Sequence, residues 1–571
     1  MHKFKLIFSV LFPLLLFFGI AKNVLAVNEP VILYTDITSG PNTGGENNNG
    51  AIVSIFGKNF GNNLNDITVY VGGGQVVRKV YFGPSLGRSD IQQLAVQLGP
   101  SAATGSIQVF VNGVGSNTDI TFTVRSGNIY YAAVGGNDNN NGSYSAPWEH
   151  LDIAKSRLSA GDILYALDGV AQTAVDSLGG NVTAIRIVET RGSAVTGTEA
   201  NPIAVVCYPG GTCYIGNADT GPTRGINIYF SWWTFSGFHI VSNLSNNGSA
   251  FAILEDPSHY GLEGNRLVNC NLTGAYYTVT SHGCSHSRFL GNTLNPSLHS
   301  MFYYTGSGYQ AQHDIEIAWN YAHDGPTTDG FPIKIYYAPP TGYDCEACRL
   351  VDDVRVHDNL VVNGTRSSFL IGGKDTMGGA YKYPFLQDVL VYNNIVYGQV
   401  SGYAFAFSQT QDEENVESEA NYELYNNTVY LGSGYGSNAL SITSCKTAII
   451  KNNAFIQDSG DYIFHQGSES TDWDNDVVVD HNGYYGGIAV PSEDANPITG
   501  NPFFADAVNH NFRLTTNSPY INSGIPTGIM RDFDGISRPQ GSGYDIGAFE
   551  YDENTPADMV APAGPGGLSV R

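Results

Sequence analysis

The stretch over residues 328–336 sets an aspartate five residues before a lysine, in a segment with the alternation of a β-strand. Period-two alternation sends Phe331, Ile333 and Ile335 to one side of that strand and Lys334 to the other. A lysine on the outer face of a strand can act as a general base once it is deprotonated. Taking the proton beside a carboxylate also requires a cation or a metal ion to stabilise the resulting charge. Lys334 is therefore the first candidate for the base of a β-elimination.

Two more basic side chains, Lys374 and His282, fall at the ends of similar apolar runs, so either is an alternative base. Arg366 precedes the run that ends at Lys374 and is the candidate that neutralises the substrate's charge. A shift of one residue in strand register would turn such a side chain away from the surface. The other candidates for substrate binding are Tyr304, Tyr336 and Asp375.

Acidic side chains in the same region favour a rival chemistry, hydrolysis by a pair of carboxylates. Such a pair lies ~5 to 9 Å apart. Neighbouring parallel strands lie ~4.8 Å apart, so two carboxylates on such strands can have that spacing. The candidate carboxylates are Asp324, Asp329, Asp375 and the acidic residues 412–414. A third alternative is a surface protein that binds carbohydrate without cleaving it. Elimination is favoured over hydrolysis because the residue spacing defines no carboxylate pair.

A short phrase with a central asparagine recurs through the middle of the chain at intervals of 26 to 39 residues. Alternating apolar segments flank it, which predicts short strands. Self-similarity at this period is typical of solenoids, whose coils bury their apolar faces against each other. An asparagine at the same corner of each coil can adopt left-handed backbone angles and hydrogen-bond to the asparagines above and below. The predicted ladder consists of Asn265, Asn292, Asn320, Asn359, Asn394, Asn427, Asn453 and Asn482.

This pattern resembles right-handed parallel β-helix proteins, most of which handle polysaccharides. We therefore expect an all-β chain in which residues 126–551 form a right-handed parallel β-helix. The three longest intervals hold insertions at residues 336–349, 374–386 and 410–420, which all leave the solenoid from the same edge. Long loops gathered on one edge of a rigid scaffold are expected to form the wall of a substrate groove.

Residues 27–125 have a different sequence pattern from the repeats, with short alternating segments separated by closely spaced turn residues. This pattern predicts a small β-sandwich. Three segments follow one another here: Gly57-Lys-Asn-Phe-Gly61, Val69-Tyr-Val-Gly-Gly73 and Thr104-Gly-Ser-Ile-Gln-Val-Phe-Val-Asn-Gly113. Their order resembles that of immunoglobulin-like TIG domains. The resemblance implies a spacer or docking module, and we assign it no chemistry.

The segment Asp329-Gly-Phe-x-x-Lys334 resembles the D-G-F-x-x-K phrase of calcium-dependent pectate lyases in polysaccharide lyase family nine. In that family the aspartate binds calcium, so the resemblance implies Asp329 as a metal ligand and calcium as the candidate cofactor. The family's next coil carries an acidic cluster, whereas the corresponding coil here, Gly364-Thr-Arg-Ser-Ser-Phe369, has none. Residues 330–385 contain as many basic as acidic side chains, against a formal net charge of −25 for the whole chain. Such a relatively positive region suits an acidic polysaccharide as the substrate.

The first 26 residues have a basic start, an apolar run over residues 6–20 and a small residue at Ala26. This is typical of a secretory signal peptide cleaved after Ala26. No later stretch is apolar enough to predict membrane insertion, and the acidic composition disfavours nucleic acid and anionic membranes as partners. We expect a monomer, secreted or at the cell surface, with a flexible tail over residues 552–571. Two small disulfides are predicted, Cys207 with Cys213 and Cys345 with Cys348.

Overall fold

The computed structural model describes residues 29–173, 176–178, 181–188, 196–216, 223–243, 248–256, 258–307, 309–326, 328, 330–337, 350–374, 386–398, 401–410, 420–431, 438–443, 445–458, 462–465, 476–487 and 489–553. The predicted signal peptide, most of the predicted tail and the Cys345–Cys348 pair lie outside these residues. The predicted disulfide between Cys207 and Cys213 is present. The described chain is almost entirely β-structure, with short helices α1 (Ala154–Arg157), η1 (Glu46–Asn48), η2 (Leu64–Asp66) and η3 (Leu151–Ile153). None of these helices is long and apolar enough to cross a membrane.

The N-terminal part is the predicted β-sandwich, here called the sandwich. One sheet has the order β1-β3-β7-β6 and the other β2-β10-β8-β4-β5, with β9 beside β8. Along β4, Ile67, Val69 and Val71 are buried and the residues between them are not, which is the period of a strand with one buried face. The strands are β1 (Val31–Thr35), β2 (Ser39–Gly40), β3 (Ile52–Lys58), β4 (Ile67–Val71), β5 (Gly74–Gln75), β6 (Arg78–Pro84), β7 (Gln92–Gln97), β8 (Gly105–Val111), β9 (Val114–Gly115) and β10 (Thr121–Val124).

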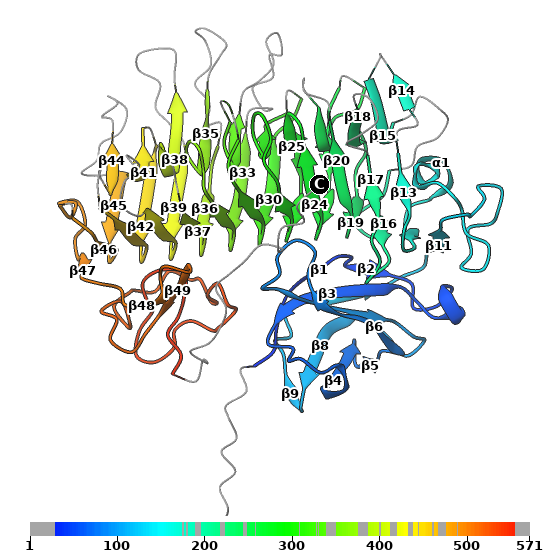
Figure 1. Cartoon of the computed structure of the whole chain (residues 1–571), viewed down its shortest axis with the longest axis horizontal. Helices are drawn as coiled ribbons and strands as arrows, with labels where there is room; N and C mark the ends of the chain where they lie inside the picture. Colours follow the sequence, from blue (N-terminus) through cyan, green and yellow to red (C-terminus); the bar gives the residue numbers. More distant parts are fainter. Residues whose placement is uncertain are drawn as a thin grey trace, which may run out of the picture.

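The rest of the chain coils into a parallel β-helix with three long sheets (Figure 1). The first sheet contains β11 (Ile129–Ala132), β12 (Ile163–Ala166), β16 (Ile203–Cys207), β19 (Trp233–Ser236), β23 (Arg266–Val268), β27 (Arg288–Leu290), β30 (Gln312–Ala318), β33 (Val351–His357), β36 (Val389–Tyr392), β39 (Asn421–Tyr425), β42 (Thr447–Lys451) and β45 (Val477–Asp480). The second sheet contains β13 (Ala171–Gln172), β17 (Tyr214–Ile215), β20 (His239–Ser242), β24 (Asn271–Gly274), β28 (Thr293–Leu294), β31 (Tyr321–His323), β34 (Leu360–Val362), β37 (Ile395–Tyr397), β40 (Thr428–Leu431), β43 (Ala454–Gln457), β46 (Gly483–Tyr485) and β47 (Ile498–Thr499).

The third sheet contains β14 (Asp176–Leu178), β15 (Asn181–Ile187), β18 (Thr223–Ile228), β21 (Ser249–Ile253), β25 (Tyr277–His282), β29 (Phe302–Thr305), β32 (Ile333–Tyr337), β35 (Phe369–Lys374), β38 (Tyr403–Thr410), β41 (Asn438–Ile442) and β44 (Ile463–His465). Strands of this sheet precede the three insertions, and a first-sheet strand or bridge follows each of them. The predicted common edge therefore exists. Two short pairs, β22 (Leu262–Glu263) with β26 (Cys284–Ser285) and β48 (Phe504–Asp506) with β49 (Asn511–Leu514), complete the described strands.

The predicted asparagine ladder lies at the corner between the first and second sheets. In each step, the backbone N–H and the side-chain amide of one asparagine both donate to the Oδ1 of the next, at 2.8–3.0 Å. The ladder runs from Asn292 to Asn482, where Asp494 accepts the last bonds. Because these amides are buried, the ladder satisfies polar groups that would otherwise lack partners.

Two details of the predicted ladder are wrong. Asn265 is not part of it: Cys270 occupies the corner of that coil and donates its N–H to Asn292. The left-handed backbone also belongs to the residue before each corner asparagine, as at Trp319 (φ 56°) and Asp358 (φ 53°), and not to the asparagine itself. The asparagine is selected for its buried side-chain hydrogen bonds, while its predecessor turns the chain.

Two parts of the chain cover outer faces of the solenoid (Figure 1). The sandwich core continues into the outward side chains of the first sheet, including Tyr131 and Tyr165. The coils end at β47, earlier than predicted, and the chain then folds back over the second sheet, where Phe512 and Phe549 pack on its apolar side chains. Among the described residues, no comparable apolar cluster covers the outer face of the third sheet. Within the described residues, the outer face of the third sheet is therefore uncovered.

Candidate active site on the third sheet

Lys334 is the second residue of β32, on the outer face of the third sheet. Its register partners are Tyr303 of β29 and Leu370 of β35. The flanking Ile333 and Ile335 are 0% and 1% exposed and point into the solenoid. Strand alternation therefore holds Lys334 on the open face.

Aromatic rings surround the ammonium group of Lys334. Its Nζ lies 4.7 Å from the ring centre of Tyr303, 4.9 Å from that of Tyr336 and 5.7 Å from that of Phe331. Burial among these rings lowers the pKa of Lys334 to about 8. No described carboxylate lies within ion-pair distance of Nζ. Near neutral pH a fraction of Lys334 is therefore the free amine, the form that accepts a proton.

The rings around Lys334 belong to a larger group that crosses neighbouring coils of the third sheet. Tyr277 contacts Tyr303 with ring centres 5.8 Å apart and His299 at 5.1 Å, and His299 stacks on Tyr276 at 5.4 Å. All its members are partly exposed. The group, here called the aromatic platform, consists of Tyr276, Tyr277, His299, Tyr303, Phe331 and Tyr336. Such a surface can pack against the apolar faces of sugar rings.

Arg366 brings a second cation to the platform from the next coil. Its exposed guanidinium lies 6.0 Å from the ring centre of Phe331. The predicted inward orientation of Phe331 is wrong, because the ring is partly exposed and lies beneath both Lys334 and Arg366. Phe331 precedes β32, so strand alternation does not reach it.

His282 ends β25 at the edge from which the long insertions leave. Its partner in register is Thr305 of β29. The imidazole is exposed to solvent, yet many protein atoms surround it, and the lost hydration lowers its pKa. His282 is therefore mostly neutral at pH 7, in the form that accepts a proton.

Glu255, next to His282, is an ionisable residue that the sequence does not indicate. It accepts hydrogen bonds from Ser307 Oγ and, at 3.3 Å, from the Gly261 N–H, while burial raises its pKa to about 7. Gly283 makes room for it, since a Cβ there would meet the Glu255 Cδ at 2.9 Å. Glu255 belongs to no repeated phrase, and only the stacking of three coils brings its partners together.

Asp324 lies past the end of the second sheet rather than on the third. It accepts a hydrogen bond from Asn363 Nδ2 at 2.8 Å and lies 3.0 Å from His323 Nδ1, and these contacts hold its pKa below the usual range. The side chain is exposed. Its described partners are thus structural neighbours at a turn, and none belongs to the aromatic platform.

Tyr304, predicted to bind substrate, is 1% exposed and belongs to the core. Its hydroxyl donates to the carbonyl of Cys284 at 2.9 Å, so it has no face for a ligand. The outward tyrosine of β29 is Tyr303, one residue earlier. Tyr336, in contrast, lies beside Lys334 on the open face.

The remaining predicted residues lie wholly or partly outside the described part of the chain. Asp329 and Asp375 lie outside the described residues, as do the acidic residues 412–414, and of Lys374 only the backbone at the end of β35 is described. The described part of the chain contains no group of three or more His, Cys, Asp or Glu side chains suited to a metal ion.

The comparisons with known proteins match the two parts of the chain separately. Residues 35–124 match the IPT/TIG domain family, so the sandwich is a TIG domain. A search of curated protein sequences finds no match.

Solved structures similar to this chain include the pectate lyase Pel9A, with 16% identity and a TM-score of 0.46, covering 75% of this chain and 97% of that one. A rhamnogalacturonan lyase is similar with 12% identity and a TM-score of 0.30, covering 73% and 96%. An alginate lyase from Paenibacillus sp. str. FPU-7 has 14% identity and a TM-score of 0.28, covering 56% and 95%. At such identities and TM-scores, no activity carries over from these proteins to this chain.

Proposed function

We propose that the protein cleaves an acidic, uronate-containing polysaccharide by β-elimination on the outer face of the third sheet, with Lys334 as the base. One observation carries this proposal. Lys334 is held on the open face against the rings of Tyr303 and Tyr336, and burial lowers its pKa to about 8 without any described carboxylate to hold the proton. A buried lysine near neutrality is suited to proton abstraction.

The chemical step would run as follows on this surface. The free amine of Lys334 takes the proton from C5 of a uronate, the electron pair forms the C4–C5 double bond, and the C4–O bond breaks. Arg366 would neutralise charge that develops on the carboxylate. The leaving oxygen requires a proton, and Tyr303 can supply it, because burial raises its pKa and keeps its hydroxyl protonated.

The aromatic platform supplies the binding surface of this proposal. Its rings extend from Lys334 across β29 and β25, perpendicular to the strands and along the solenoid axis. A polysaccharide lying along this axis would place successive sugars on successive coils.

Calcium remains a candidate cofactor on the resemblance around Asp329. Asp329 lies outside the described residues, and the proposed step does not involve the metal. Chelation followed by titration with calcium would test this. A stable loss of activity that calcium restores would support a metal site, and activity unchanged by chelation would remove it.

Hydrolysis is the second candidate, and Glu255 favours it. A carboxyl group with a pKa of about 7 is protonated for much of the time at neutral pH and can act as a general acid on a glycosidic oxygen. Its basic partner would have to be a second carboxylate on a neighbouring coil. Glu255→Gln should abolish hydrolysis in this case while Lys334→Ala should not.

A panel of pectate, alginate, glycosaminoglycan and sulfated polysaccharides separates these functions. Products should be read both as reducing ends and as absorbance of the unsaturated sugar. Reducing ends accompanied by that absorbance support elimination. Reducing ends without it reject elimination in favour of hydrolysis, and silence in both readouts across the panel favours a non-catalytic carbohydrate-binding protein.

Export and oligomeric state also belong to the proposal. We propose a secreted or cell-surface protein processed after Ala26, which the N-terminal sequence of the mature protein would test. We further propose a monomer, to be checked by light scattering during size-exclusion chromatography.

A further inference from the structure

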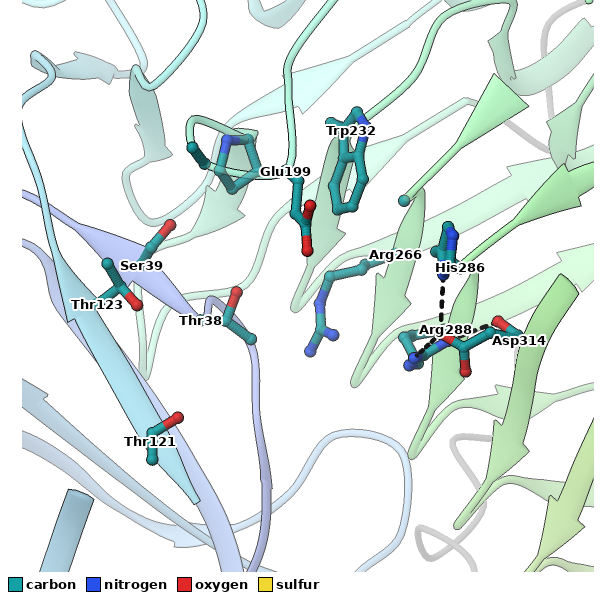
Figure 2. A pocket seen from close by; sticks show the side chains of 13 residues that line it. Thr38, Ser39, Thr121, Thr123, Glu199, Trp232, Arg266, His286, Arg288 and Asp314 are labelled. Carbon is teal, nitrogen blue, oxygen red and sulfur yellow. Dashed lines mark hydrogen bonds and ion pairs between the residues drawn. The ribbon is translucent and has the colours of Figure 1, made fainter. Parts of the chain in front are cut away.

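A cleft lies where the sandwich meets the first sheet (Figure 2), on a different sheet from the aromatic platform. Its volume is about 540 Å³, in the range of sites for small ligands. Sandwich strands β2 and β10 form one wall, and the first-sheet strands and turns form the other. The cleft contains none of the residues of the proposed active site.

Arg266 is the central charged group of the cleft. Figure 2 shows its guanidinium extending from the first-sheet wall into the space between the walls. One nitrogen donates to the Thr35 carbonyl at 2.9 Å, whereas its buried Nε has no partner. Within the described residues, no carboxylate forms an ion pair with Arg266.

The neighbouring arginine of the cleft, Arg288, already has acidic partners. Arg288 lies 2.6 Å from Asp314 and 3.0 Å from Glu316, so its charge is already compensated. Arg266 therefore retains its capacity to bind an anion. Glu316 and Asp36 stabilise the charge of Arg266 from a distance, but no described carboxylate contacts the guanidinium, so an external anion is a favourable addition.

Trp232 gives the cleft an aromatic face near Arg266 (Figure 2). Its backbone has φ 61°, an uncommon conformation for a bulky residue, and its ring lies against Gly264, where an added Cβ would come within 2.1 Å of the indole. The indole also stacks with His286 at 6.5 Å. The same left-handed backbone recurs at this corner of the next coils, at Gly264, His286 and Asp314, so the regular corner geometry holds the Trp232 ring in the cleft beside Arg266.

The sandwich wall contributes hydroxyl groups, and the turn before β16 contributes a carboxylate. Thr38, Thr121 and Thr123 line the side facing Arg266, and the exposed Glu199 points into the cleft (Figure 2). The hydroxyl groups and the carboxylate of the cleft can hydrogen-bond to the hydroxyl groups of a sugar. A small anion without hydroxyl groups would only be repelled by Glu199.

We propose that this cleft binds an acidic sugar, a uronate unit of an oligosaccharide, with its carboxylate on Arg266 and its ring on Trp232. The site would hold product or polymer away from the proposed active site, and the TIG domain would form half of it. The choice of uronates rests on the proposed function, but the cleft residues are independent of Lys334.

The test measures binding to the full-length chain carrying Lys334→Ala, so that no probe is cleaved. Trigalacturonate, trimannuronate and the neutral maltotriose are titrated by calorimetry and by tryptophan fluorescence. We expect at least one acidic trisaccharide to bind and maltotriose not to bind. Adding Arg266→Gln should weaken that binding at least about tenfold, because a charge-assisted hydrogen bond is lost.

Two further variants assign the binding to the cleft. Trp232→Asn removes the ring but keeps a residue that tolerates positive φ, and it should weaken binding and abolish the fluorescence change. Lys451→Ala changes a first-sheet residue outside the cleft and should leave this binding unchanged. Unfolding temperatures identify any variant that fails to fold.

The proposal is overturned if no acidic trisaccharide binds, if maltotriose binds equally well, or if Arg266→Gln and Trp232→Asn bind like their parent. Binding lost in Arg366→Gln but kept in Arg266→Gln would assign it to the aromatic platform instead. If no polysaccharide of the panel is cleaved but an acidic trisaccharide still binds to the cleft, the proposed reaction is rejected and the proposed cleft site is retained.

Discussion

The outer faces of the first and third sheets both present cations at outward strand positions, but the side chains around these cations differ between the two sheets. On the first sheet, Glu316 lies between Arg288 at 3.0 Å and His357 at 3.1 Å. On the third sheet, Lys334 contacts aromatic rings and no described acid. Apart from Arg266 in the cleft, these first-sheet cations form a paired network beside the docked sandwich, whereas the third face is open.

The pKa values follow from this difference. Burial disfavours the charge of His357, but hydrogen bonds to Asp358 and Glu316 outweigh it and raise its pKa to about 9. For Glu316 burial acts to raise the pKa, and His357 and Arg288 lower it to about 2. Lys334 has only burial, so its pKa moves toward neutrality. Pairing fixes a charge for structure, whereas burial without a partner leaves a group that can exchange protons.

The largest effect is expected on removing the sandwich, which tests whether this domain is a separable spacer. A chain that begins at Ser126 exposes the outward apolar residues of β11 and β12 and removes Lys58, whose ammonium lies 2.8 Å from the buried Asp534. We expect this chain to aggregate or to lose most of its cooperative unfolding, measured by size-exclusion chromatography and calorimetry. A soluble, active fragment with the unfolding temperature of the full chain would show that the sandwich is only a spacer.

The next effect concerns the open face. Lys334→Ala should lower turnover on the cleaved polysaccharide by at least ~100-fold, since a general base typically contributes that much. Lys451→Ala, which removes a first-sheet lysine, is the matched control and should keep turnover near normal. Unchanged turnover in Lys334→Ala would shift the role of the base to Lys374 or His282.

Much of the solenoid could be predicted because its determinants are local and repeated. Each corner asparagine sits in the same short phrase, and alternation alone orients Lys334 between two buried isoleucines. Tyr304 shows the limit of that reasoning. Register fixes its orientation, because Tyr304 pairs with the inward Ile335 and Tyr303 with Lys334, and a one-residue difference reverses the face.

The missed features depend on contacts between distant parts of the chain. Glu255 meets Ser307 only when coils stack, and Arg266 forms a cleft only with the docked sandwich. One sequence signal of that docking was present: β12 and β16 are continuous apolar runs, buried on both faces. Such runs indicate that a sheet is covered on both sides, whereas β42 has the alternation of a strand with one exposed face.

A smaller effect tests the paired network. His357→Phe keeps the ring that stacks on Tyr392 at 4.5 Å but removes the cation beside the buried Asp358 and leaves Glu316 with Arg288. We expect a loss of about 3 kcal/mol in the free energy of unfolding, typical of a buried ion pair that is broken from one side. His313→Phe, at the more exposed pair with Asp352, should cost less than about 1 kcal/mol. Equal losses would mean that burial does not distinguish the two pairs.

The pH dependence of stability follows from the same histidine. Its pKa is raised in the folded state, so the folded protein binds the proton more tightly than the unfolded chain. The resulting stability is complete below about pH 6.5 and is lost as the pH rises through about 9. Denaturant unfolding across this window should show a decline of about 1 to 3 kcal/mol that His357→Phe lacks. The same decline in both proteins would assign it to another group.

The smallest effect is the pH dependence of catalysis. With a pKa of about 8, the free-amine fraction of Lys334 rises about fivefold between pH 7 and pH 8 and then levels off. If Lys334 is the base, kcat/KM should follow this rise, because only the deprotonated free enzyme can accept the C5 proton. Tyr336→Leu sharpens the comparison of the two faces, because it removes a ring beside the amine and admits water. The midpoint should then move upward toward the ordinary pKa of lysine. A flat profile, or one that falls from pH 7 to pH 8, would contradict Lys334 as the base, and a falling limb near pH 7 would point to the acid form of Glu255.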